Sequence, residues 1–150
     1  MPARKAAAVC YRLTETGEPE FLLVRNKDDT HWVFPKGTVE GWEAFGYQAA
    51  SREAWEEAGA RGEVEARRLG TFRHQAWLKK SCEWMVQEVE AYLLRVTDTK
   101  GTPEPGREPT WFSLSGARRA LETEAVIPAA EGGAAVMLDL AAARFQGVGI

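Results

Sequence analysis

Runs of apolar residues separated by polar turns predict several strands in the first third of the chain. Residues 6–13 and 20–25 form two such runs, and the polar segment between them predicts a turn. A third, short apolar run at 31–34 is stopped by Pro35. The next segment, 35–44, is rich in Gly and Glu and is predicted to be a loop.

The pattern then favours a helix from about residue 45 to residue 58, because alanines recur along it and Gly59 is a natural C-terminal stop. Two long strands are expected after it, at 63–73 and 83–96. The remaining predictions are a loop at 97–109, a strand at 110–112, a short helix through Leu121 capped by Ser113 or Ser115, and a last helix at 128–144. This order suggests an α/β fold, with helices on both faces of a mixed sheet.

Length and charge narrow the possible functions. The 150 residues fit one domain, 1–150, and the net charge of -3 argues against general nucleic-acid binding. No apolar run reaches about 18 residues and no signal peptide is recognisable, so we expect a cytoplasmic protein without a membrane partner. Cys10 and Cys82 are too few for a disulfide framework and are expected to be reduced thiols in strands.

Three glutamates are grouped in the predicted helix. Glu53, Glu56 and Glu57 stand at i, i+3 and i+4, which places them on one face. Their mutual repulsion would be offset by Arg52 or by a divalent cation, and oxygen ligands without His or Cys favour Mg²⁺, with Mn²⁺ as a substitute. The alternative is a solvated acidic face. A Gly-rich loop before the helix, and the position of the glutamates where the helix dipole disfavours anions, favour a functional site.

The same residues resemble a known motif. Gly37, Glu43 and residues 52–60 (R-E-A-W-E-E-A-G-A) are similar to the Nudix box, G-x5-E-x7-R-E-U-x-E-E-x-G-U, in which U is apolar. Here eight residues, and not seven, separate Glu43 from Arg52. One extra residue inside a helix would rotate all that follows by about 100°, so we place it in the loop or first turn at 44–47, which leaves the role of Glu43 open.

The resemblance extends to the flanking segments 32–37 and 111–112, and so covers roughly residues 5–122. It implies an α/β/α sandwich with a mixed β-sheet, and hydrolysis of a phosphoanhydride bond. It also implies functions for individual residues: Gly37, Glu53, Glu56 and Glu57 as metal ligands, Glu56, Glu57 and Arg52 as catalytic residues, and Glu56, Glu88 or Glu90 as the general base. For Glu88 and Glu90, a solvent-facing strand position is an equally good interpretation.

The longer spacer and Trp55 between the glutamates are most similar to the subgroup of diadenosine and diphosphoinositol polyphosphate phosphohydrolases. A small-molecule polyphosphate is therefore the expected partner of a monomer or homodimer. Alternatives within the family are a nucleotide-pool sanitising enzyme and an RNA 5′ pyrophosphohydrolase. A non-catalytic ligand-sensing module is disfavoured, because such modules usually lose carboxylates of the box.

Local charge supports a polyanionic substrate. Residues 61–80 contain six Lys or Arg and two Glu, in a chain that is acidic overall. The candidate phosphate-binding residues are Lys36, Arg25, Arg73, His74 and Lys79. Trp32, Trp77 and Trp84 are candidates for stacking on a base, and Trp77 is expected to be the most exposed, near a hairpin tip.

Overall fold

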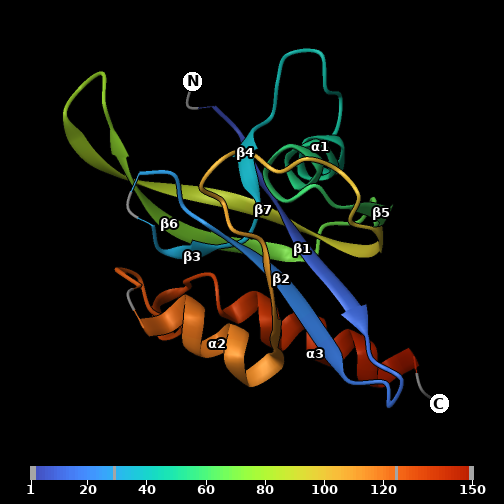
Figure 1. Ribbon diagram of the computed structural model, residues 1–150. Coiled ribbons are helices and arrows are strands. Elements are labelled where there is room, and N and C mark those ends of the chain that lie inside the picture. Colours follow the sequence, from blue (N-terminus) through green and yellow to red (C-terminus); the bar gives the residue numbers. More distant parts are fainter. Residues whose placement is uncertain (1–2, 29, 124, 149–150) are drawn as a thin grey trace.

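A single mixed β-sheet organises the computed structural model, which describes residues 3–28, 30–123 and 125–148 (Figure 1). In chain order the elements are β1 (Lys5–Leu13), β2 (Pro19–Arg25), β3 (Trp32–Val33), β4 (Lys36–Thr38), α1 (Gly46–Ala58), β5 (Arg61–Val64), β6 (Gly70–Leu78), β7 (Glu83–Asp98), β8 (Thr110–Ser113), α2 (Leu114–Thr123), the 3₁₀ helix η1 (Ala129–Glu131) and α3 (Val136–Val148). The strand order is β3-β2-β1-β7-β5, with β4 beside β1, β6 beside β7 and β8 beside β2. Only the β1–β7 pair is parallel among the described strand pairs.

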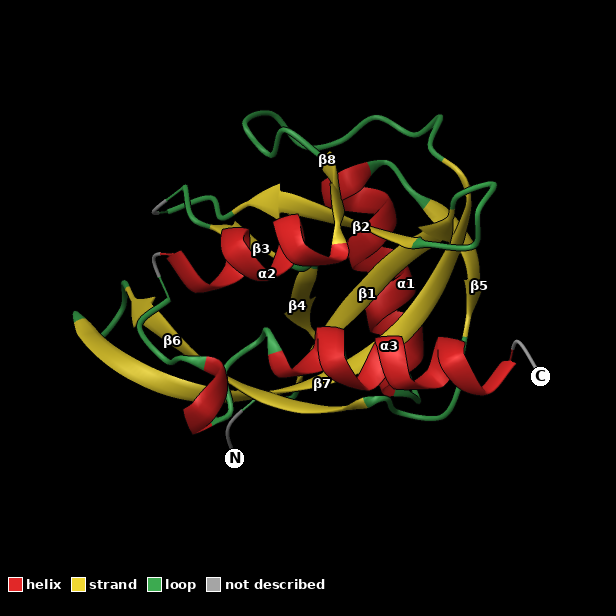
Figure 2. Cartoon of the chain, turned by 90° about the horizontal axis from the view of Figure 1, so that it is seen from below, coloured by secondary structure: helices red, strands yellow, loops and turns green. Residues whose placement is uncertain are grey.

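Helices cover both faces of this sheet. α2 and α3 lie on one face, and α1 lies behind the sheet on the other (Figure 2). The side chains of β1 alternate between the two cores that result: Ala6 and Ala8 pack with the alanines of α1, whereas Ala7 and Val9 pack with α2 and α3. The predicted α/β/α sandwich with a mixed sheet is confirmed.

Four local predictions were wrong. The expected strand at 63–73 is two strands, β5 and β6, which both pair with β7 while residues 65–69 bow out between them. The expected loop before α1 contains β4, because its backbone completes a ladder with β1. The expected last helix is divided into η1 and α3, since Gly132 ends η1 in the left-handed conformation with φ of 88°. Cys82 lies in the β6–β7 turn and not in a strand.

The helix that carries the glutamates was predicted to within one residue. At its start the Gln48 side chain accepts a hydrogen bond from the Phe45 N–H (2.9 Å), and at its end Gly59 adopts a left-handed φ of 65°. α2 is capped by Ser113, whose hydroxyl accepts from the Gly116 N–H at 3.1 Å. None of the helices in the described ranges is long and apolar enough to cross a membrane.

Candidate active site

Two buried carboxylates stand where α1 packs against β4. Glu53 and Glu57 are one turn apart and only 8% and 4% exposed. The Lys36 N–H, on β4, donates a hydrogen bond to Oε1 of Glu57 at 3.3 Å. A Cβ at the next residue, Gly37, would collide with the Glu53 carboxylate, so glycine at this position lets that carboxylate lie against β4.

This pair carries negative charge that its surroundings compensate only in part. Burial is the main cause that raises the pKa of Glu57 above the ordinary value of a glutamate, and its hydrogen bond with Glu53 acts in the same direction. The charges of Arg107 and Lys36 oppose this rise in pKa without cancelling it. A bound divalent cation would offset the same charge and displace the proton, so the donor chemistry of the pair fits Mg²⁺.

Arg52 is the centre of the ion-pair network around the pair. Its guanidinium contacts Glu43 through two nitrogens (3.0 and 3.1 Å), and it donates to Glu53 (2.8 Å), to Glu56 (3.2 Å) and to the carbonyl of Thr38 (2.9 Å). Through these hydrogen bonds Arg52 contacts Glu43, Glu53 and Glu56 at once, and its role in orienting the glutamates stays a prediction.

The role of Glu43, left open by the sequence, follows from the same network. Its side chain is only 1% exposed, and the hydrogen bonds from Arg52 hold the pKa of its carboxyl below the usual range. The extra residue between Glu43 and Arg52 does not keep their side chains apart. α1 begins only at Gly46, so the extra residue is accommodated in the loop before this helix. Glu43 is therefore the buried anion that fixes Arg52.

Glu56 differs from its two neighbours. Its side chain is 46% exposed and its carboxylate is turned towards Arg52. Over the described part of the chain, no three acidic, His or Cys side chains converge as a preformed metal cage. The three glutamates thus form a buried pair, Glu53 and Glu57, with a third carboxylate at the rim, and the Gly37 carbonyl stays a predicted further ligand.

The close packing of Gly37 predicts a specific effect of substitution. Gly37→Ala is expected to displace the Glu53 carboxylate and to weaken Mn²⁺ or Mg²⁺ binding at least tenfold, while the flexible Glu53 side chain lets the fold persist. Calorimetric titration measures the affinity, and circular dichroism measures the fold. Gly41→Ala is the matched control, because a Cβ there meets nothing within 4 Å. Native metal affinity in Gly37→Ala would contradict the assignment.

Arg107 was not predicted as a site residue. It comes from the connection 99–109, which crosses the end of α1 and is fastened there by a hydrogen bond from the Glu104 N–H to the Glu56 carbonyl (3.0 Å). Its guanidinium lies 3.5 Å from Oε2 of Glu57 and donates to the Glu104 side chain at 2.9 Å. The contact joins residues 50 positions apart in the numbering, so no local pattern indicated it.

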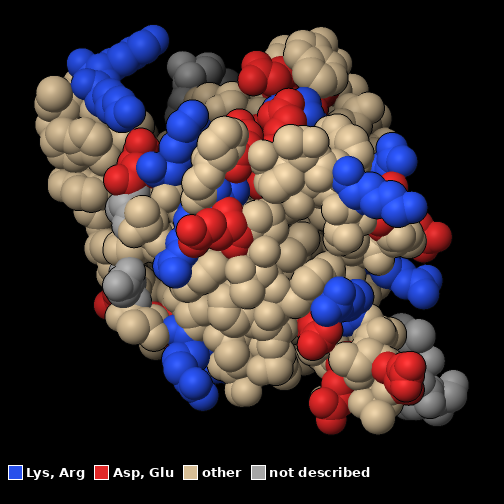
Figure 3. All heavy atoms as spheres, viewed as in Figure 1, with Lys and Arg blue, Asp and Glu red and all other residues tan. Residues whose placement is uncertain are grey.

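The candidate phosphate-binding residues do not gather into one patch. Lys36 is the one next to the carboxylate pair. Arg25 stacks over Trp32 at 3.8 Å from the ring centroid, whereas Lys79 lies at the β6–β7 turn and pairs with Asp28 at 3.5 Å. Figure 3 shows Lys and Arg spread over the face in view, with acidic groups between them.

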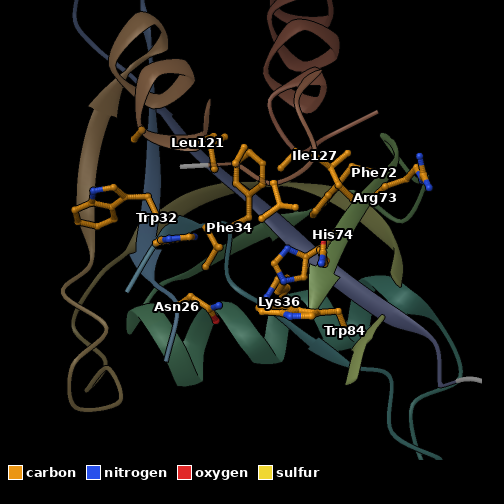
Figure 4. Close-up of a pocket in the computed structure, with 17 residues that line it drawn as sticks. Asn26, Trp32, Phe34, Lys36, Phe72, Arg73, His74, Trp84, Leu121 and Ile127 are labelled. Atoms are coloured by element: carbon orange, nitrogen blue, oxygen red, sulfur yellow. The ribbon is translucent and has the colours of Figure 1, made fainter. Parts of the chain in front are cut away.

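The other two, Arg73 and His74, are consecutive residues of β6 beside a cavity that adjoins Lys36. Their side chains leave opposite faces of the strand, and that of Arg73 is directed away from the cavity (Figure 4). Of the other basic residues of 61–80, Arg61 belongs to β5, Arg67 and Arg68 to the loop after it, and Lys80 to the β6–β7 turn. The alternating directions of strand residues disperse a charge cluster that is compact in sequence.

The two strand carboxylates proposed as bases differ in their environment. Glu90 is held by two hydrogen bonds from Arg4 (both 3.0 Å) and one from the Tyr92 hydroxyl, and the Arg4 contact lowers its pKa. Glu88 is exposed and stands opposite Arg73 in the β6–β7 ladder. The ion pair with Arg4 gives Glu90 a structural role, and Glu56 stays the candidate base nearest the buried pair.

The exposure of the tryptophans that are candidates for stacking differs in part from the expectation. Trp77 is exposed near the hairpin turn, at 40%, but Trp84 is more exposed, at 58%. These two rings meet edge to face with centroids 5.3 Å apart. Trp32 is half-buried and meets Phe112 edge to face at 5.0 Å.

Comparison with known proteins places this chain in a family. The NUDIX domain family matches residues 3–132. Diphosphoinositol polyphosphate phosphohydrolase 2 of Rattus norvegicus is 32% identical over 120 residues, which are 79% of this chain and 63% of that protein. The chain thus spans less than two thirds of that relative's length. Diphosphoinositol polyphosphate phosphohydrolase 3-beta of Homo sapiens is 30% identical over 123 residues, which are 79% of this chain and 69% of that protein.

Solved structures show the same fold. A crystal structure of a C. elegans Ap4A hydrolase in a binary complex superposes with a TM-score of 0.70 and 23% identity, and covers 97% of this chain and 99% of that one. A possible asymmetric diadenosine tetraphosphate hydrolase from Jonesia denitrificans gives a TM-score of 0.65 and 19% identity over 97% of this chain and 96% of that one. With its box residues placed as described and its family matched over most of its length, the chain belongs to the NUDIX domain family.

Proposed function

We propose that this protein is a Mg²⁺-dependent hydrolase of phosphoanhydride bonds in small polyphosphates. The observation that carries the proposal is the buried pair of Glu53 and Glu57 against β4, held by Arg52 and next to Lys36. Two close, buried carboxylates destabilise a fold unless cations offset their charge, so their presence here favours a cation-binding role. The names of the curated relatives, phosphohydrolases of diphosphoinositol polyphosphates, support the reaction class.

The residues present fit the proposed metal. Glu53 and Glu57, with Glu56 at the rim and the carbonyl of Gly37, would supply hard oxygen ligands of the kind that Mg²⁺ prefers and Mn²⁺ accepts. When bound, such an ion supplies charge compensation for phosphoryl oxygens and makes water more acidic.

The chain's own groups complete the proposed chemistry. The Lys36 ammonium neutralises a phosphate beside the pair, and Arg52 keeps Glu53 and Glu56 in fixed orientations. Glu56, the solvent-accessible carboxylate of the three, takes the proton of the attacking water. Water attacks phosphorus in line, the bond from that phosphorus to the bridging oxygen breaks, and the phosphate or nucleotide that carries this oxygen leaves.

A substrate panel tests this function. Diadenosine polyphosphates and diphosphoinositol polyphosphates are the proposed substrates, and modified deoxynucleoside triphosphates and 5′-triphosphorylated RNA represent the alternatives. We expect phosphate or nucleotide product with millimolar Mg²⁺ and none with EDTA. If no substrate gives product with either Mg²⁺ or Mn²⁺, the proposed hydrolase activity is refuted and a non-catalytic ligand-sensing module is favoured. The cytoplasmic location and the monomeric or homodimeric state stay predictions from the sequence.

A further inference from the structure

Trp42 is the most exposed of the large apolar side chains that the structure describes, at 74%. It belongs to the connection between β4 and α1, which stands out from the sheet beside the helix (Figure 1). A single apolar residue on a surface does not indicate a role by exposure alone. Two further features distinguish Trp42: the rigidity of the turn that carries it, and its position next to the carboxylates.

The turn that carries Trp42 is closed on both sides of the ring. The Glu43 N–H donates a hydrogen bond to the carbonyl of Glu40 at 2.9 Å, and the Glu40 N–H donates to Oε1 of Glu43, also at 2.9 Å. Glu43 is itself buried and is held by two nitrogens of Arg52. Trp42 thus projects from the middle of a fixed turn, so a ligand that contacts its ring pays little for ordering the backbone.

Arg52 connects this ring to the acidic centre. Its guanidinium carbon lies 5.8 Å from the centroid of the Trp42 ring, within the range of a cation–π contact. The same guanidinium donates to Glu53 at 2.8 Å and to Glu56, at the exposed rim, at 3.2 Å. One side chain therefore bridges the indole and two of the carboxylates. A substrate whose phosphates are held at these carboxylates carries the group that follows them towards Trp42.

The chemistry of the indole limits what that group is. The face of an aromatic ring is electron-rich, so it repels phosphate groups and favours flat, uncharged rings that stack on it. Stacking on an aromatic side chain tolerates any nucleobase, because each base has a π face. An inositol ring that bears phosphates around its circumference presents negative charge to the indole on every side, and so does not match this surface.

From this arrangement we propose that Trp42 determines specificity in the proposed reaction, by stacking on an aromatic base that follows the phosphates on the Glu56 side of the carboxylates. The inference rests on the proposed function and favours a nucleoside or dinucleoside polyphosphate among the substrates that it leaves open. The sequence did not single out Trp42, because the residue stands at a variable position of the box, between Gly37 and Glu43.

Binding separates this role from catalysis. The probe is a diadenosine tetraphosphate analogue with methylene bridges in place of the bridging oxygens, titrated by calorimetry with Mg²⁺ into the native chain and into variants. Trp42→Ala is expected to weaken binding at least about fivefold, whereas Trp42→Phe keeps most of the affinity, since phenylalanine retains a ring. Phe45→Ala is the matched control: Phe45 is 57% exposed in the same connection, but its ring already stacks on Tyr47 at 5.6 Å.

Inorganic tripolyphosphate, which has no base, distinguishes stacking from an indirect effect through Arg52. Its affinity is expected to be the same for the native chain and for Trp42→Ala. In kinetics with diadenosine tetraphosphate, Trp42→Ala is expected to raise KM by the factor lost in binding and to leave kcat unchanged. Thermal unfolding checks the fold, and the exposure of Trp42 predicts a native melting temperature.

The outcomes also separate this inference from the proposed function. Native affinity of Trp42→Ala for the analogue, or an equal loss of affinity for tripolyphosphate, would overturn the stacking role and leave the hydrolase standing. Loss of analogue binding in Trp42→Ala, in a chain that hydrolyses no substrate, would support the stacking role and refute the proposed function.

Discussion

Glu57→Gln is expected to lower kcat for phosphoanhydride hydrolysis by a factor of about 10²–10⁴, which corresponds to about 3–5 kcal/mol of barrier. Glutamine preserves the shape of a side chain that is only 4% exposed, so the packing of α1 on β4 is kept. The substitution removes a charge from the buried pair, and with it most of the affinity for a divalent cation. The fall in kcat is therefore expected to come from weaker metal binding and not from unfolding.

The measurement is steady-state hydrolysis at saturating Mg²⁺, together with thermal unfolding with and without Mg²⁺. The native protein is expected to be stabilised by Mg²⁺, and Glu57→Gln to lose that stabilisation without a lower melting temperature in EDTA. Glu63→Gln, an isosteric change on an exposed side chain of β5, is the control and keeps native kcat. A folded Glu57→Gln protein with near-native turnover would show that Glu57 is not a ligand.

Arg52→Met is expected to reduce the free energy of unfolding by about 3–5 kcal/mol, the largest stability effect that we predict. Arg52 is the partner of Glu43, whose carboxylate is almost completely buried, and its loss leaves that charge without a counterion. Arg52→Lys is expected to recover only part of the stability, because an ammonium cannot reproduce the two-nitrogen contact with Glu43.

Urea unfolding in EDTA measures this effect apart from metal binding. The double variant Arg52→Met, Glu43→Met tests the cause, because removal of both charges is expected to restore most of the lost stability. Arg61→Ala is the control: its pair with Asp98 is mostly exposed on the arginine side, and we expect a loss of at most about 1 kcal/mol. If the double variant is as unstable as Arg52→Met alone, the unpaired charge of Glu43 is not the cause of the lost stability.

The part of the site that lies within one helix was predictable from the sequence. Helical spacing placed Glu53 and Glu57 on one face, and the alanines with Gly59 fixed the limits of α1 to within one residue. The spacing also allowed the i,i+4 pair of Arg52 and Glu56, but not the place of Glu56 at the exposed rim of the site. That place depends on which side of α1 packs against β4, and this packing is decided only in the folded protein.

Contacts between segments that are distant in the sequence were the main features that the sequence did not predict. The approach of Arg107 to Glu57 requires the β7–β8 connection to cross α1, which no periodicity in the sequence encodes. Likewise, the division of the expected strand at 63–73 depends on how each half pairs with β7. The count of charges over 61–80 was misleading as well, because those side chains come from β5, the loop after it, β6 and the β6–β7 turn, and so point in different directions.

The connection that carries Arg107 is tied at two places. Its middle is hydrogen-bonded to the last turn of α1, and Arg107 itself exchanges backbone and side-chain hydrogen bonds with Arg25 at the end of β2 (2.6 and 3.2 Å). Arg25 in turn stacks on Trp32, which lines the cavity that adjoins Lys36. Insertion or deletion of a residue in this connection would therefore change both the contact of Arg107 with Glu57 and the position of Trp32 at the cavity wall. A segment outside the glutamate helix can thus alter the site while every glutamate of that helix is unchanged.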